Sequence, residues 1–549
     1  MEENVNVSLN EEVKPMTFNK DYLKRTIWIG LAFFGILLVW QLYNSYCSPM
    51  LSFLFARSTY PENLQNAEIA YDAAKAFWES SSDSVRATYA NKEWIDPNTG
   101  LNWLFGENGA LGFNMKSILR AGYITSDDYL DVQWKVGIIM ALDNIAALFI
   151  MPIFGGLSDK TRTKLGKRMP YIIVGSVVTA IALPFIPLFF AKGMASFDAE
   201  LTGFVVGMIA TMIVIIVFMM SYRSPAVALM PDLTPKPLRS KANGVINIVG
   251  YVGGAFGAIF AMAIPVTSYI DGSNRSLWML EIPFIVCSVV LLISLLLLLK
   301  KVKENELAAK LREDIERGDA MGESAEQVTT TGKLSKTNIR NLALILVAEI
   351  FWFMSLNAVE TFQTNYFMFW LNTSSAGGAV MTLVSGVASV AGFLLAGMLA
   401  DKIGRKWTIF TGICTVALCY VLYSLIPASK TQGTFDASFP WYFLVLVPII
   451  GFGSSLIHIC SFPLVTDYCT ADKLGKFTSL YYTASMLAQS ITPILIGLIW
   501  KAPNAQWNAL PIYSAILMGI AGLVFFFVKA PRRNDTGENA KGLAALGDD

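Results

Sequence analysis

Long apolar stretches alternate with short polar segments along most of the 549 residues of this chain. A helix needs roughly 20 apolar residues to cross a bilayer, and each stretch reaches that length. The pattern therefore predicts an all-α, polytopic membrane protein with about twelve transmembrane helices. The spans are expected at residues 26–50, 132–156, 170–191, 202–230, 242–267, 279–299, 341–370, 377–400, 406–426, 441–464, 477–500 and 511–529.

The polar segments divide the spans into two pseudo-symmetric halves of six helices each. An insert after the first span contains Trp78, Trp94 and Trp103, which predicts a small ordered cap. A structural role is favoured over a role in substrate gating. The linker between the halves is expected to be a solvated helix from Glu304 to Arg317, with Glu306/Lys310 and Glu313/Arg317 pairs, and then flexible over 323–332. The predicted domains are 1–25 (cytoplasmic N-terminus), 26–299 (first half, with the insert at 52–131), 300–340 (linker), 341–529 (second half) and 530–549 (cytoplasmic tail).

Composition agrees with a membrane protein. The chain is 54% hydrophobic and 15% charged, whereas a soluble domain carries roughly 25% charged residues. A net charge of +1 argues against nucleic acid as a partner. The six cysteines show neither metal-ligand spacing nor a disulfide framework, so no metal and no cofactor are expected. The polar first 20 residues and the long first apolar run do not resemble a cleavable signal peptide.

Basic residues gather in alternate loops. Loops 157–169, 231–241 and 401–406 contain several lysines and arginines, whereas the loops between them contain a single base each. Because cytoplasmic loops carry an excess of Lys and Arg, these loops and both termini are expected in the cytoplasm. The predicted location is the cell membrane, with the lipid bilayer as a partner.

Two of the basic loops repeat one pattern. GGLSDKTRTKLGKR begins at Gly155, and the shorter GMLADKIGRK begins at Gly397. Asp401 follows Asp159 by 242 positions, and Asp467 follows Asp232 by 235, which indicates a duplicated half. A carboxylate at such a helix end can pair with arginine and so hold an inner gate of a transporter; alternatively the bases only fix topology. The gating candidates are Gly155, Asp159, Arg162, Arg168, Asp232, Asp401, Arg405 and Asp467.

Three patches in the first half resemble a known family. The run SDKTRTKLGKRMPY from Ser158 to Tyr171, the run RSPAVALMPDLT from Arg223 to Thr234, and Trp40 nine residues before Pro49 are similar to plant sucrose carriers. The chain thus resembles the major facilitator superfamily. More narrowly, it resembles its proton-coupled sucrose and disaccharide symporters, which are related to the glycoside–pentoside–hexuronide cation symporters. This resemblance implies the twelve-helix fold of that superfamily and sugar transport.

The chain departs from melibiose-type sodium carriers of that group on the second span. Those carriers have two aspartates four residues apart just before a proline, whereas this chain has Ala147 and Met151 before Pro152. Asp143 stands alone one turn earlier. Since sodium requires several oxygen ligands, a lone carboxylate favours a proton as the coupling ion.

Charged residues inside spans are costly and therefore functional candidates. Asp143 and Arg223 are expected to interact directly or through water or substrate, as a proton-coupling pair or as a static buried pair. Glu349 and Glu360 lie 11 residues apart, which places them on one helix face. Glu349 is the second proton candidate, and Glu360 lies near the outer end. His458, the single histidine, is either a packing residue or a proton or sugar contact.

Sugar recognition requires aromatic faces and a few placed polar groups. Three stripes at helical spacing offer them, and the alternative for each is hydrogen bonding between helices. The stripes are Trp40, Tyr43, Asn44 and Ser48; Asn243, Asn247 and Tyr251; and Tyr482, Ser485 and Gln489. The predicted substrate-binding residues are Trp40, Tyr43, Asn44, Asn247, Tyr251, Gln489, Arg223, Glu360 and His458.

The sequence as a whole predicts a monomeric glycoside or disaccharide importer that works by proton symport and alternating access. One alternative is a proton-coupled drug antiporter, which favours an apolar aromatic site over stacked amides. A second is a transporter-like sensor that binds through the insert. No constellation of an enzyme is present, because His458 has no nucleophile and acid partner.

Overall fold

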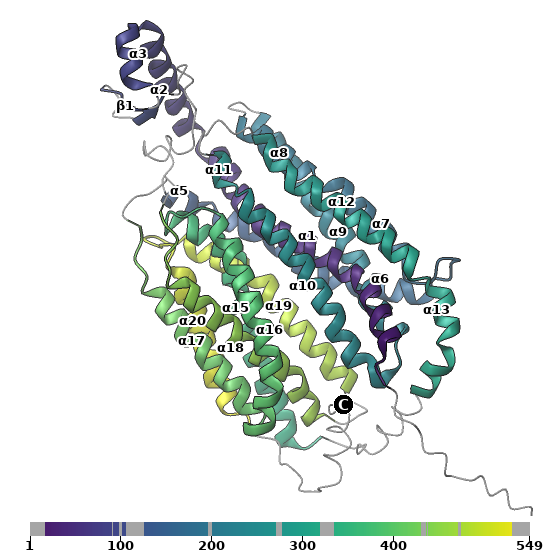
Figure 1. Cartoon of the computed structure of the whole chain (residues 1–549). Helices are drawn as coiled ribbons and strands as arrows, with labels where there is room; N and C mark the ends of the chain where they lie inside the picture. Colours follow the sequence, from purple (N-terminus) through teal and green to yellow (C-terminus); the bar gives the residue numbers. More distant parts are fainter. Residues whose placement is uncertain are drawn as a thin grey trace, which may run out of the picture.

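The computed structural model describes residues 17–90, 92–97, 102–105, 126–195, 200–270, 277–318, 334–429, 435, 437–469 and 474–529. Within these residues, twelve helices are long and apolar enough to cross a membrane. They form one elongated bundle, in which the first six spans and the last six lie side by side (Figure 1). The parts of the predicted termini, insert and linker at 1–16, 91, 98–101, 106–125, 319–333 and 530–549 lie outside the described residues.

The first group of spans is helical in the predicted places, with two breaks. The predicted third span is divided after Ala182. Pro184 has no backbone N–H to donate to the helix, and it disfavours the helical conformation of the residue before it. The fifth span ends at Ala263, two residues before Pro265. The helices are α1 (Lys20–Thr59), α6 (Gln133–Lys160), α7 (Met169–Ala182), α8 (Phe185–Ala195), α9 (Glu200–Asp232), α10 (Arg239–Ala263) and α12 (Glu281–Lys301), with short elements η1 (Lys236–Leu238), α11 (Thr267–Ile270) and η2 (Leu277–Leu280).

The second group has six uninterrupted helices. Pro448, Pro463 and Pro493 lie inside two of them, so these helices continue past their prolines. The group consists of α15 (Lys336–Phe369), α16 (Ala376–Ile403), α17 (Arg405–Ser424), α18 (Phe443–Tyr468), α19 (Leu474–Trp500) and α20 (Ala509–Phe526).

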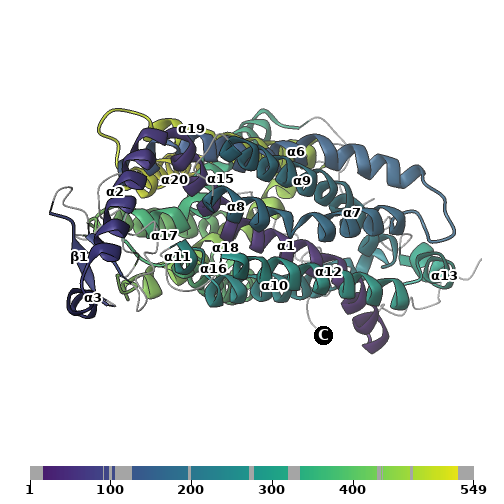
Figure 2. The same ribbon diagram turned by 90° about the horizontal axis from the view of Figure 1, so that it is seen from above.

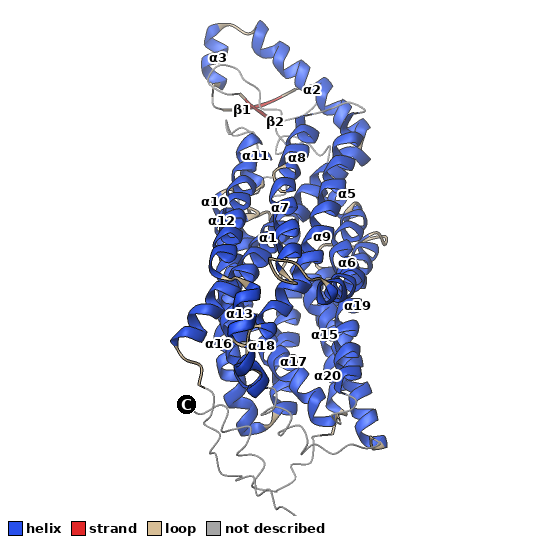
Figure 3. Cartoon of the chain, turned by 90° about the vertical axis from the view of Figure 1, so that its right-hand side faces the viewer, coloured by secondary structure: helices blue, strands red, loops and turns tan. Residues whose placement is uncertain are grey.

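The insert lies beyond one end of the bundle, which we call the insert end (Figure 3). The first helix continues through Thr59, so the insert begins later than the predicted residue 52. Phe77 and Trp94 stack with ring centroids 4.3 Å apart, and Trp78 stacks on Phe105 at 4.7 Å, so the predicted ordering around tryptophans is present. Its elements are α2 (Pro61–Ser80), α3 (Asp83–Tyr89), the antiparallel strands β1 (Glu93–Ile95) and β2 (Asn102–Leu104), and α5 (Ser126–Asp131).

The linker begins at the opposite end of the bundle, which we call the linker end (Figure 2). Helix α13 (Glu304–Lys310) is followed by a further helical turn to residue 318. Ion pairs in this segment include Lys303–Glu306 at 3.0 Å and Arg312–Glu316 at 2.8 Å. Asp314 accepts a hydrogen bond from the Tyr22 hydroxyl at 3.0 Å, which ties the linker to α1.

The two groups meet along helices that pack closely. A Cβ added to Gly137 on α6 would lie 2.1 Å from the carbonyl oxygen of Pro493 on α19. Only glycine permits this approach of the two backbones. Close packing here places the polar side chains of α6 directly opposite the second group.

Candidate functional site

The central candidates come from helices of both groups. Trp40 and Tyr43 on α1 stack with ring centroids 6.1 Å apart, and the Arg223 guanidinium of α9 lies 5.8 Å from the Trp40 ring centroid. Asp143 on α6 and Glu360 on α15 interact electrostatically across the boundary between the groups. We call Trp40, Tyr43, Asp143, Arg223 and Glu360 the central cluster.

Asp143 is 3% exposed and is held by its neighbour in the chain. Its Oδ1 atom accepts hydrogen bonds from the backbone N–H of Asn144 at 2.5 Å and from the Asn144 side-chain amide at 2.8 Å. Asp143 and Arg223 interact electrostatically, but no hydrogen bond or ion pair joins them within the described residues. Their expected interaction is therefore an electrostatic one without direct contact.

Glu349 and Glu360 occupy different surroundings, although their spacing places them on one helix face. Glu360 is exposed and interacts electrostatically with Tyr251 on α10, so it faces the boundary between the groups. Glu349 is fully buried, and neither carboxyl oxygen has a hydrogen-bond partner among the described residues. The shared face does not give a shared environment, because the packing of α19 and α20 changes along α15.

The other predicted sugar contacts mostly bond within their own helices. The Asn247 amide donates to the Asn243 carbonyl oxygen at 2.8 Å, and the Gln489 amide donates to the Ser485 carbonyl oxygen at 3.2 Å. The His458 ring packs against Phe353, with centroids 5.2 Å apart. The remaining candidates differ in burial: Tyr482 and Tyr251 are exposed, and Asn44 is half-buried.

Ser48 belongs to a network at the insert end that the sequence analysis missed. The Asn365 side-chain amide on α15 donates to Ser48 Oγ at 3.0 Å, Ser52 Oγ at 3.0 Å and Gln133 Oε1 at 2.9 Å. The Gln133 amide in turn donates to Ser52 Oγ at 3.1 Å. All four side chains are fully buried. We call them the insert-end cluster; two serines one turn apart were its only signal in the sequence.

Further contacts join the groups at the same end. Thr267 and Ser374 share a hydrogen bond of 3.0 Å between hydroxyls. The Trp507 indole donates to Ser126 Oγ at 3.1 Å, and the Ser126 hydroxyl donates to the Phe369 carbonyl oxygen at 3.1 Å. The groups are therefore held together by polar contacts at the insert end.

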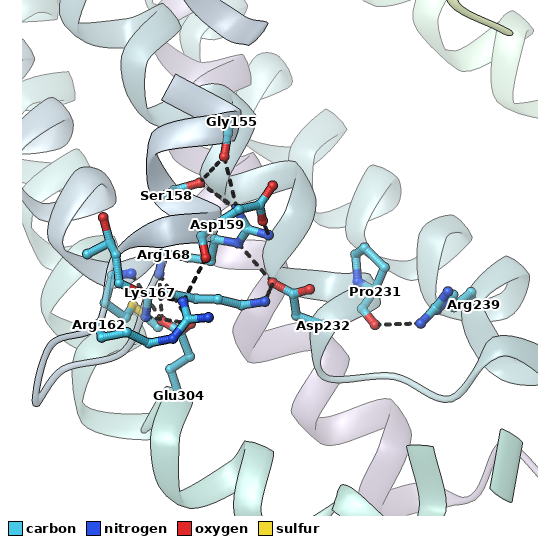
Figure 4. Close-up of polar contacts among 12 residues, drawn as sticks. Gly155, Ser158, Asp159, Arg162, Lys167, Arg168, Pro231, Asp232, Arg239 and Glu304 are labelled. Atoms are coloured by element: carbon cyan, nitrogen blue, oxygen red, sulfur yellow. Dashed lines mark hydrogen bonds and ion pairs between the residues drawn. The ribbon is translucent and has the colours of Figure 1, made fainter. Parts of the chain in front are cut away.

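The predicted gating residues of the first group meet at the linker end (Figure 4). Arg168 donates through Nε to Asp232 Oδ2 at 2.8 Å and through its terminal nitrogens to Asp159 and Ser158. Lys167 Nζ lies 3.0 Å from the same Asp232 oxygen. The Arg168 side chain is 5% exposed, Asp232 is 24% and Asp159 is 62%. Among the partners that the sequence offered for Asp159, the structure pairs it with Arg168, and both lie in one group.

Electrostatics favour this arrangement. Burial by itself lowers the pKa of Arg168, but the hydrogen bonds and charges of Asp232 and Asp159 outweigh it, so the pKa is raised. Arg162 bonds differently from the prediction, since it donates to the backbone oxygens of Asp159 at 2.6 Å and Thr161 at 2.9 Å.

Gly155 allows Ser224 to approach, because an added Cβ would lie 2.7 Å from Ser224 Oγ.

Glu304 completes this site and was not predicted. Its carboxylate accepts backbone hydrogen bonds from Lys167 at 2.9 Å, Arg168 at 3.0 Å and Met169 at 3.1 Å, which are orphan donors at the start of α7. A carboxylate is favoured at a helix N-terminus. Gly166, with φ of +121°, lets the loop pass close to Glu304. We call Asp159, Lys167, Arg168, Asp232 and Glu304 the linker-end cluster.

The second group repeats only part of this cluster. Arg405 Nη1 lies 2.5 Å from Asp467 Oδ1, at positions that correspond to Arg168 and Asp232. Burial raises the pKa of Asp467, and Arg405 acts in the opposite direction. Asp401 is exposed and makes no ion pair with a described residue, so the expected role of this aspartate as a second gate partner is not seen. In the part of the chain that is described, no group of three His, Cys, Asp or Glu could hold a metal.

Comparison with known families assigns the fold. The family model described as Major Facilitator Superfamily matches residues 111–376 and 364–547. A curated relative, sucrose transport protein SUC4 of Arabidopsis thaliana, is 28% identical over 170 residues, which are 27% of this chain. That match spans 32% of the relative, about a third of its length.

Solved structures with the same fold have low sequence identity. The xylose transporter XylE from E. coli in an inward open conformation is 15% identical, with a TM-score of 0.52 over 93% of this chain and 98% of its own. A bacterial homologue of the human lysosomal transporter Spinster, inward-facing, is 12% identical, with a TM-score of 0.55 over 94% and 97%. At these identities the similarity shows the fold alone.

Proposed function

The chain belongs to the Major Facilitator Superfamily, and we propose that it imports a glycoside or disaccharide by proton symport through alternating access. It is a transporter with twelve candidate membrane spans and not an enzyme. The observation that carries the proposal is the central cluster, in which Arg223 lies over the Trp40 ring and two carboxylates from opposite groups interact.

The sugar is the best fit to these side chains. A sugar ring presents apolar carbon faces to aromatic rings and hydroxyls to charged groups, and Trp40 with Arg223 offers both within one site. The partial similarity to a sucrose transport protein, and the sugar transporter among the structures of the same fold, support this substrate class.

A proton is the proposed coupling ion. Asp143 is buried, lacks the second aspartate of the sodium carriers and has no ion-pair partner among the described residues. In this proposal, ionised Asp143 attracts Arg223 away from the substrate. Protonated Asp143 releases Arg223, which then binds sugar hydroxyls. Arginine suits this role because its planar fork can make two parallel hydrogen bonds.

The two end clusters are the proposed gates. The insert-end cluster joins the groups where the insert lies, and the excess of bases in the loops of the linker end favours an outside location for the insert end. A closed insert end is one of the two arrangements that alternating access requires. Opening the outer end then requires the hydrogen bonds of Asn365 to break.

Uptake and exchange in proteoliposomes test the proposal. Purified protein should accumulate a disaccharide, with sucrose as the first probe, when an inward proton gradient is applied. Asp143→Asn should exchange sugar across the membrane but lose accumulation against a gradient. Arg223→Ala should lose binding, and Arg223→Lys should not fully restore it. The matched control Asp83→Asn, a fully exposed side chain in the insert, should behave as wild type.

Full accumulation by Asp143→Asn would contradict the coupling role of Asp143. Absence of uptake for all mono- and disaccharides, with uptake of an apolar cationic drug, would favour the antiporter alternative. Binding without any transport would favour a sensor.

A further inference from the structure

Glu349 is a buried acid that the central cluster does not use. It lies on α15, 13 residues after Lys336, which is about 20 Å along the helix. The side chain is 0% exposed, and neither oxygen has a hydrogen-bond partner. No described cation forms an ion pair with it. A carboxyl group in such a position is an unusual choice for packing.

One hydroxyl chain lies beside Glu349. Tyr481 on α19 interacts electrostatically with it, and the Tyr481 hydroxyl shares a hydrogen bond of 2.7 Å with Ser461 Oγ on α18. Ser461 donates its own proton to the His458 carbonyl oxygen at 3.2 Å. With that proton committed, Tyr481 donates to Ser461, and no hydrogen bond joins Tyr481 to Glu349 in this arrangement.

The other helices packed against α15 bring no charge to this level. α20 presents Phe525 to Trp352, and α18 presents the His458 ring to Phe353, one turn from Glu349. α1 and α16 meet α15 near Asn365 and Thr364 at the insert end. The acids of α16 and α18 are at the linker end, where Asp401 is exposed and Asp467 pairs with Arg405.

An ionised carboxylate here would be desolvated with no compensating partner, which is strongly unfavourable. The group is thus neutral in this arrangement, where an apolar side chain of equal size would pack at lower cost. The acid is explained if it exchanges its proton in another arrangement of the helices. A relative movement of the two groups would change the surroundings of Glu349. Helices α15 and α19 of the second group contact α1 and α6 of the first group, respectively.

We propose that Glu349 is a second proton-binding site of the transporter, separate from the central cluster, with Tyr481 on α19 as the polar group beside it. The proposal deepens the proton-coupled function proposed above. It implies that two protons, one on Asp143 and one on Glu349, take part in a transport cycle.

Infrared difference spectroscopy of the full chain in lipid nanodiscs tests the site without sugar or transport. A buried protonated carboxyl group has a carbonyl stretching band that an ionised one lacks. Wild type should show such a band at neutral pH, and Glu349→Gln should lose it. Tyr481→Phe should shift its frequency, because the phenol that interacts electrostatically with Glu349 is removed. The control Glu281→Gln, at the start of α12 outside this cluster, should leave the band unchanged.

A spectrum unchanged by Glu349→Gln overturns the proposal, even if proton symport through Asp143 is correct. If Glu349→Gln does not fold, Glu349→Asp should retain an acid band at a displaced frequency, and an unchanged band there also overturns it. In proteoliposomes, Glu349→Gln should bind and exchange sugar while the number of protons moved per sugar falls from two to one. An unchanged ratio overturns the second-proton role. A third outcome separates the two proposals. If Glu349→Gln loses the infrared band but wild type transports no sugar, only the proposed substrate and coupling are contradicted.

Discussion

Asn365 on α15 donates its side-chain amide to Gln133 Oε1 on α6 at 2.9 Å, and this contact links the two six-helix groups where both side chains are fully buried. The same amide reaches two serines of α1. One side chain therefore joins α15, α6 and α1 at the insert end. Its hydrogen bonds exist only while the groups are in contact at that end, which makes it the natural residue to test for gating.

Asn365→Ala should shift the protein toward the state that is open at the insert end. Three hydrogen bonds made only in the closed arrangement are lost, and a shift of about 1–3 kcal/mol between states is expected. Spin-label distances between the insert-end residues of α1 and α15 measure it. Thr411→Val, which removes a bond within α17 only, is the control. Identical distance distributions for Asn365→Ala and wild type would contradict a gating role.

Asp232→Asn should destabilise the protein more than Asp159→Asn. Asp232 accepts Arg168 and lies beside Lys167, and its removal leaves a buried guanidinium with fewer partners, at a cost of about 1–3 kcal/mol. Asp159 is largely exposed, so its contribution is expected below about 1 kcal/mol. Thermal unfolding in detergent compares the two. The reverse order would mean that Asp159 is the main partner of Arg168.

Asp159→Asn also tests the inner gate. If this carboxylate holds the gate shut in another state, the variant should spend more time inward-open, as spin-label distances across the linker end would report. Because the Asp159–Arg168 contact lies within one group in this structure, unchanged distances would limit Asp159 to topology and local packing.

Glu304→Ala should lower stability by about 1–2 kcal/mol, since three backbone donors at the start of α7 lose their acceptor. Gly166→Ala should have a similar effect, because its φ of +121° and the nearby Glu304 carboxylate exclude a Cβ. Gly156→Ala is the matched control, as no atom lies within 4 Å of the added Cβ. Equal melting temperatures for the two glycine variants would show that the Gly166 loop adapts freely.

Uptake should follow a proton gradient and should not require sodium. The reason is that Ala147 and Met151 replace the pair of aspartates of the sodium carriers, and Asp143 stands alone one turn earlier. Accumulation is measured at constant pH with sodium as the only gradient, and at constant sodium with a proton gradient. Concentrative uptake driven by sodium alone would overturn the choice of ion.

The sequence by itself determined the twelve spans, because bilayer thickness sets the length that each apolar stretch must have. Its three motif patches indicated the family. It also indicated that Asp159 pairs with a base of its own loop, since both sit in one short motif, but only the structure selected Arg168 over Arg162. The domain limits and the site roles stay predictions.

Only the tertiary structure decided which polar side chains meet across the boundary between the two six-helix groups. Ser48, Gln133 and Asn365 are far apart in the chain, and no local pattern relates them. Glu304 likewise reaches α7 from beyond the sixth span. Glu349 and Glu360 share a helix face by spacing, yet one is buried and the other exposed. Helical periodicity gives direction around one axis, whereas burial and hydrogen-bond partners depend on which neighbouring helix covers each turn.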